Sequence, residues 1–117
     1  MIVVAIIALL AAIAIPNLVR SRVTANDAAA KAALKSISTS LETYLATNTV
    51  YPTDTTTLVG DTPPYLTTDY FTGSHEGFTF SMDVLTDYTY QASATPVGPN
   101  LGTSTFTITT GSVTNWQ

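Results

Sequence analysis

The chain opens on an uninterrupted run of apolar side chains. Residues 1–15, MIVVAIIALLAAIAI, contain no polar side chain. As an α-helix with a rise of about 1.5 Å per residue this run is roughly 22 Å long, whereas a hydrocarbon core of about 30 Å takes about 20 residues. The run therefore predicts either a buried helix or a membrane segment that lacks several residues at its front. A secretory signal peptide fits poorly, because no basic residue precedes the run and no small-residue cleavage region follows it.

A helical pattern continues after the apolar run. Its apolar positions are mostly three or four residues apart, which is typical of an amphipathic helix that covers another layer. We expect Lys31, Lys35, Ser38 and Glu42 to lie off the apolar face. The apolar face is formed by Val19, Val23, Ala30, Leu34, Ile37, Leu41, Tyr44 and Leu45.

The helix is predicted to run from about residue 1 to about residue 47. It should end near Asn48, because Tyr51 precedes Pro52 and a residue before proline is pushed out of the helical conformation. Such a helix is far longer than the average of about 11 to 12 residues, and the small domain that follows cannot cover all of it. Pro16 lies inside it, so we expect a kink or local melting there.

The second half of the chain reads as a small antiparallel sheet. Residues 77–82, 88–94 and 104–109 alternate apolar and polar side chains, with Tyr88 and Tyr90 on one face of the second segment. Residues 113–116 are a candidate fourth strand, and residues 53–73 are expected to be a long loop. The predicted fold class is α+β. Its parts are an apolar helix half at 1–15, an amphipathic half at 16–48 and a loop and sheet domain at 49–117.

Composition and charge separate the same two halves. Thr occupies 23 of the 117 positions, and all of these except Thr24 lie from Thr39 onward. The only bases, Arg20, Arg22, Lys31 and Lys35, give residues 1–35 a charge of +3, whereas residues 36–117 carry −7. The net charge of −4 argues against nucleic-acid binding through a basic surface, and the absence of cysteine excludes disulfides and thiolate chemistry.

The segment MIVVAIIALLAAIAIPNLVRSR resembles the N-terminal core of the type IV pilins. The pattern after it is also similar to that family: a helix that ends before Tyr51-Pro52, then Pro63-Pro64-Tyr65-Leu66, then a small antiparallel sheet with Ala94-Thr95-Pro96 and Gly102 between strands. In the family, a leader, a glycine cleavage point, a methylated first residue and a buried glutamate precede such a segment. We therefore expect about six further residues ahead of Met1, which would also extend the apolar run to bilayer length.

The resemblance implies a role for the apolar run and for Pro16. The run would be stored in the inner membrane and then buried in the core of a filament, and Pro16 would be the helix-perturbing proline of the family. The residues expected to pack in the filament core are Ile2, Val3, Ile6, Ile7, Leu9, Leu10, Ile13 and Ile15.

The expected function is that of a major pilin, a structural subunit of a cell-surface fibre for adhesion, motility or uptake. Its partners would be other copies of itself, the inner membrane before assembly and an ATP-driven pilus assembly machine. A pseudopilin of a type II secretion-like system and a membrane-tethered ligand-binding domain remain alternatives. Because no base follows Lys35, we also expect Arg20, Arg22, Lys31 and Lys35 to face acids of a neighbouring subunit, with Asp27 and Glu42 as local alternatives.

Chemistry-bearing residues are few. His75 is the only histidine and lies in a Gly-Ser-His-Glu-Gly turn, so no serine, histidine and acid arrangement can be argued, and an enzyme is not expected. Asp83 and Asp87 flank a turn, but two carboxylates are fewer oxygen ligands than calcium usually takes. The six tyrosines fit core and interface packing better than an electron path along a fibre. We expect no catalytic residue, cofactor or metal site.

Overall fold

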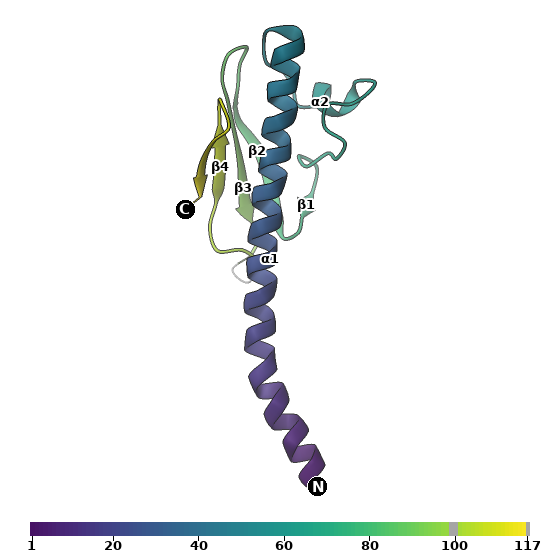
Figure 1. Cartoon of the computed structure of the whole chain (residues 1–117), viewed down its shortest axis with the longest axis vertical. Helices are drawn as coiled ribbons and strands as arrows, with labels where there is room; N and C mark the ends of the chain where they lie inside the picture. Colours follow the sequence, from purple (N-terminus) through teal and green to yellow (C-terminus); the bar gives the residue numbers. More distant parts are fainter. Residues whose placement is uncertain (99–100, 117) are drawn as a thin grey trace.

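A single long helix lies along one face of an antiparallel sheet and projects well beyond it (Figure 1). The computed structural model describes residues 1–98 and 101–116. Helix α1 spans Ile2–Asn48, and its 47 residues at about 1.5 Å each account for the longest dimension of the molecule, 70 Å in a shape of 70 × 29 × 19 Å. The predicted α+β class is confirmed.

The sheet is a meander in which each strand pairs with its neighbours in sequence. The strands β1 (Ser74–His75), β2 (Phe78–Leu85), β3 (Tyr90–Pro96), β4 (Phe106–Thr109) and β5 (Val113–Trp116) lie in the order β1-β2-β3-β4-β5, and all pairs are antiparallel. The candidate fourth strand at 113–116 is thus confirmed as β5. The expected count of three to four strands is too low, because β1 has only two residues and such a strand carries no detectable alternation.

A β-bulge in β2 explains why the expected strand 77–82 is too short. The pairing register shifts between Met82 and Val84, so Asp83 is an extra residue. Before the bulge every second side chain faces the helix, so regular alternation would place residue 84 on that face. The extra residue shifts this position to Leu85, which is half-buried, so the alternation in the sequence breaks while the strand continues.

Two other expectations for the sheet domain are wrong. Tyr88 does not share a strand face with Tyr90, because β3 begins at Tyr90 and Tyr88 lies exposed in the preceding turn. The predicted loop 53–73 contains a short helix, α2 (Thr56–Gly60), whose Leu58 is fully buried. With five residues, α2 is too short for its periodicity to be recognised in the sequence.

Two parts of the helix prediction, its end near Asn48 and its course through Pro16, have different outcomes. The end near Asn48 is confirmed: Thr49 adopts a left-handed conformation with φ 66°, and its N–H donates to the carbonyl of Leu45. Of the kink or local melting expected at Pro16, the melting is not seen, since the helix continues through this residue without interruption. Figure 1 shows a gradual bend in the N-terminal part of α1.

The core lies between the C-terminal half of α1 and the helix-facing side of the sheet. Leu34, Ile37 and Leu41 are fully buried there, which confirms this part of the predicted apolar face. The central strand β3 presents Ala92 and Ala94 to the helix, and these small side chains leave room for α1 to lie close to the sheet. Larger buried side chains surround these alanines: Phe78 and Phe80 in β2, Phe106 and Ile108 in β4, and Tyr90 at the start of β3.

Gly102 is placed where no side chain fits. A Cβ at this position would lie 2.3 Å from Cζ of Phe78 and 2.9 Å from Cβ of Pro96. Phe78 is fully buried and cannot swing away. We expect Gly102→Ala to lower the free energy of unfolding by about 1 to 3 kcal/mol, the usual cost of overpacking.

Denaturant unfolding followed by circular dichroism measures this effect. Gly60→Ala is the matched control, because Gly60 ends α2 with nothing within 4 Å of a Cβ. That variant should be neutral or more stable by up to about 1 kcal/mol. Equal stability of the two variants would contradict the packing of Gly102 against Phe78.

Candidate functional site

The main candidate site is the uncovered N-terminal part of α1. The eight side chains expected to pack in a filament core are between 51% and 77% exposed. Leu18 is also exposed, and the first fully buried residue of the helix is Ala30. The fold therefore covers only the C-terminal part of α1 and leaves an apolar rod exposed. We define the apolar rod as residues 1–18.

The apolar rod is suited to a non-aqueous environment. Helix α1 is long and apolar enough to cross a membrane, and none of its most apolar 18-residue window is buried. Burying one Leu or Ile side chain is worth about 1.5 to 3 kcal/mol. An exposed apolar surface of this extent marks a contact with lipid or with other protein surfaces.

One face of the apolar rod carries a shallow groove. The shallow groove contains no residue from the sheet domain, so any molecule that fills it must come from outside the fold. Asn17, which lines the groove, donates from Nδ2 to the carbonyl of Ile13 at 3.4 Å, and this keeps its polar side chain against the helix. The groove is lined by Leu10, Ile13, Ala14, Ile15, Asn17, Leu18 and Ser21.

A polar cluster fixes the sheet to α1 near the C-terminal end of the helix, which is the upper end in Figure 1. Glu42 Oε1 accepts hydrogen bonds from the hydroxyl of Tyr51 at 3.0 Å, the hydroxyl of Tyr90 at 3.3 Å and the N–H of Gly111 at 3.2 Å. Ser38 Oγ lies 2.7 Å from the Tyr90 hydroxyl. We call Ser38, Glu42, Tyr51, Tyr90 and Gly111 the upper clamp; it joins the helix to the turn between β4 and β5.

The upper clamp corrects the expectation that Ser38 and Glu42 lie off the packing face. Ser38 is buried and Glu42 is half-buried. Polar side chains are normally placed on the solvent face of an amphipathic pattern. Here tyrosine hydroxyls and a backbone N–H satisfy them, and no sequence pattern within the helix signals partners that lie 48 to 69 residues away.

Tyr51 makes the stability of this cluster depend on pH. Burial and the neighbouring Glu42 raise the pKa of the Tyr51 hydroxyl well above its ordinary value of about 10. The folded chain therefore keeps this proton at alkaline pH, whereas the unfolded chain releases it above pH about 10. We expect this group to lower the free energy of unfolding progressively as the pH rises above about 10, at a rate that approaches roughly 1 kcal/mol per pH unit.

Unfolding measured between neutral pH and pH 11 tests this expectation, with Tyr51→Phe as the variant. The phenylalanine variant should show a flatter loss of stability than the unmodified chain above pH about 10. Tyr88→Phe, which removes an exposed hydroxyl outside the upper clamp, is the control. Identical alkaline slopes for Tyr51→Phe and the unmodified chain would overturn the assignment.

A second polar cluster fixes the opposite, lower end of the sheet to the middle of α1. Asn26 Nδ2 donates to the carbonyl of Leu101 at 3.0 Å. Asp27 accepts from the N–H of Thr103 at 3.1 Å through Oδ1 and from its hydroxyl at 2.8 Å through Oδ2. We call these four residues the lower clamp; it ties α1 to the connection between β3 and β4.

The basic residues divide into two groups. The side chains of Arg20, Arg22 and Lys35 are exposed. Lys31 is half-buried, and its Nζ lies 4.9 Å from the centroid of the Phe106 ring of the same chain, within reach of a cation–π contact. Asp27 and Glu42, the expected local alternatives, accept hydrogen bonds in the two clamps. Contact of the basic residues with a neighbouring subunit stays a prediction.

The remaining candidate residues, His75, Asp83 and Asp87, make hydrogen bonds within the sheet domain. His75 Nε2 lies 3.2 Å from the carbonyl of Thr72, and the imidazole packs edge-on against the ring of Tyr70. Asp83 accepts from the hydroxyl of Ser81 at 3.1 Å, and the carbonyl of Asp87 accepts from the N–H of Tyr51 at 2.9 Å. Within residues 1–98 and 101–116, no three His, Cys, Asp or Glu side chains lie close enough to hold a metal ion.

Comparison with known proteins leaves the family assignment as an expectation. A scan against protein-family models and a search of curated proteins both found no match.

Proposed function

We propose that this chain is the structural subunit of a type IV pilus-like surface filament and polymerises through its apolar rod. The observation that carries the proposal is the exposure of eight large apolar side chains on a helix segment that the sheet leaves uncovered. Copies that bury these surfaces against one another in a head-to-tail array meet through unlike faces. Such contacts extend as an open filament when the rotation between copies does not close a ring.

The apolar rod also supports an earlier location in the inner membrane. A helix with this composition is stable in lipid, and extraction into a filament replaces lipid by the rods of other copies. The membrane and the filament are thus successive environments for the same surface. The assembled fibre would lie outside the cell and display the threonine-rich sheet domain.

Electron microscopy of sheared cell-surface material tests the proposal. Cells that express the full chain should yield long fibres in which mass spectrometry identifies this chain. Leu10→Asp and Ile13→Asp place charges on the apolar rod and should abolish the fibres. Thr107→Asp, on the face of the sheet away from α1, is the matched control and should leave fibres intact. Chain found only in the membrane fraction, with no fibres, would support a tethered domain instead.

The basic residues are expected to contribute weakly to assembly. Exposed ion pairs are worth about 0 to 1 kcal/mol, and salt screens them. The double variant Arg20→Gln with Arg22→Gln should lower the fibre yield at low salt and match the unmodified chain at high salt. Ala25→Gln, which changes an exposed residue of α1 outside the groove on the apolar rod, is the control. Unchanged yield at both salt concentrations would show that Arg20 and Arg22 do not contribute to assembly.

A further inference from the structure

We propose that the sheet continues from one copy to the next, with β5 of one subunit pairing with the free edge of β2 of its neighbour. The inference rests on the proposed function, because it takes the copies to share one orientation, as they do in a filament. It adds a specific contact between sheet domains to the contact between apolar rods.

The edge of β2 that faces away from β3 is mostly unpaired. On that side β1 pairs only with Phe78 and Thr79, whereas β2 continues to Leu85. Among the described residues, no strand pairs with Phe80–Leu85 along this edge. Unpaired strand edges are templates for strand addition.

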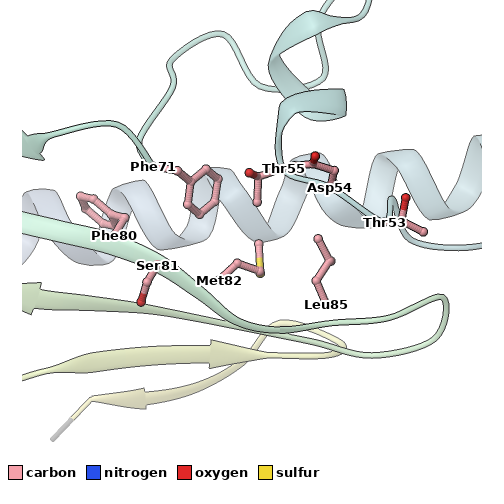
Figure 2. Close-up of a pocket in the computed structure, with 8 residues that line it drawn as sticks. All are labelled: Thr53, Asp54, Thr55, Phe71, Phe80, Ser81, Met82 and Leu85. Atoms are coloured by element: carbon pink, nitrogen blue, oxygen red, sulfur yellow. The ribbon is translucent and has the colours of Figure 1, made fainter.

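A groove runs along this free edge. Its volume is about 400 Å³, and its walls are β2 on one side and the segment around Thr53–Thr55 with Phe71 on the other. In Figure 2, Phe80, Met82 and Leu85 extend from β2 towards Phe71 and Thr55, whereas Ser81 points to the opposite face of the sheet. The groove offers apolar contacts to alternate side chains of an added strand, beside backbone groups that can pair with it.

The direction of β5 fits this edge. Three successive antiparallel pairs separate β2 from β5, so β5 runs opposite to β2. A neighbour in the same orientation therefore brings its β5 antiparallel to β2. Pairing of β5 with β5, or of β2 with β2, across a two-fold axis would turn the helices of the two copies in opposite directions and would not fit a polar filament.

The charges of the two edges are also compatible. Asp54 lines the groove and Asp83 occupies the bulge, and no lysine or arginine follows Lys35. An acidic strand would be repelled there. Residues 111–117, GSVTNWQ, contain no charged side chain. The turn that begins β5 is held against α1 by the upper clamp, which presents the strand in a fixed orientation.

The bulge limits the length of the contact. The regular part of the free edge is Phe80–Met82, because the ladder is interrupted between Met82 and Val84. Strand β5 has four residues, one more than this stretch, so about three of its positions can pair there. A bulge with an acidic residue at a sheet edge also prevents unlimited pairing with other chains. We therefore expect a short, register-specific contact.

Engineered cysteines in the full chain test the contact, since the chain has no cysteine of its own. Ser81→Cys is combined with Val113→Cys or with Asn115→Cys, because these positions lie on the same face of the sheet. Within one copy β2 and β5 are three strand spacings apart, about 14 Å, which exceeds the Cα separation of about 7 Å that a disulfide allows. Any disulfide must then join two copies.

Fibres of the double variants are oxidised mildly and analysed on non-reducing gels. We expect ladders of dimers, trimers and larger multiples, with about tenfold more product than a control pairing Thr95→Cys with the same β5 cysteine, since disulfides form only within about 7 Å. Thr95 is exposed on the same face, but its strand is paired on both edges.

The outcomes separate the two proposals. Fibres that form without ladders, or with ladders equal to the control, would overturn the sheet contact and leave the filament intact. If the unmodified chain forms no fibres, the proposed function fails and the sheet contact fails with it.

Discussion

Deletion of residues 1–15 is expected to convert a chain that requires lipid, detergent or self-assembly into a soluble monomer that keeps its sheet. The deleted residues contribute nothing to the core, because the buried positions of α1 begin at Ala30. The remaining helix retains Leu34, Ile37 and Leu41 together with both clamps. Loss of the exposed side chains removes the largest apolar surface of the molecule.

Analytical ultracentrifugation and far-ultraviolet circular dichroism measure the two parts of this expectation. The truncated chain should sediment as a monomer without detergent and show strand signal. A longer deletion, of residues 1–33, is the matched comparison; it removes the lower clamp and two buried alanines, and it should unfold the sheet. Aggregation of the shorter deletion, or loss of its strand signal, would contradict the division of α1 into an apolar rod and a packed half.

Ile37→Asp is expected to unfold the sheet domain. Ile37 is fully buried in the core, and a carboxylate there would have no partner and no water. The cost of several kcal/mol is comparable to the total stability of about 5 to 15 kcal/mol of a small domain. The milder Ile37→Ala should leave the fold in place and lower the free energy of unfolding by about 2 to 5 kcal/mol.

Thr39→Asp is the control for this prediction. Thr39 is exposed two residues further along the same helix, so it introduces the same charge with the same helix propensity on the solvent side. Thermal unfolding of the three variants, in the background that lacks residues 1–15, gives the comparison. A folded Ile37→Asp variant with a melting temperature like that of Thr39→Asp would mean that α1 does not pack on the sheet through this face.

The helix and the sheet class are predictable from the sequence because their signals are long and periodic. The apolar positions Leu34, Ile37 and Leu41 recur at helical spacing, and they are the residues that the fold buries. The end of α1 follows from local chemistry around Pro52. The direction and the order of the strands follow from the short connections between them.

The features that the sequence does not reveal depend on long-range contacts or on very short elements. The bulge at Asp83 moves the apolar position in β2, and the alternation is lost although pairing continues. Ser38 and Glu42 read as solvent-facing because their partners, Tyr90 and Gly111, are distant in the chain. Strand β1 and helix α2 are shorter than the window that periodicity needs.

The candidate site also has one part that the sequence predicts and one part that depends on tertiary contacts. The apolar rod is evident from residues 1–15 alone, and its exposure follows once the length of the helix exceeds what a small sheet covers. The groove along β2 is not evident, because it depends on β1 ending its pairing at Thr79 and on the position of Phe71 across the gap. A tertiary arrangement of this kind has no signature in local spacing.

The consecutive strand order has a consequence for folding kinetics. Every pairing in the sheet joins neighbours in sequence, so each hairpin can close with little loss of loop entropy. Docking of α1 joins segments that are far apart in the sequence, across separations of 69 residues in the upper clamp and 76 in the lower clamp. Hairpin formation therefore does not require the N-terminal part of the helix, and the sheet can form while lipid holds the apolar rod. Docking of the amphipathic half is then the step that closes the longest loops, at the largest entropic cost.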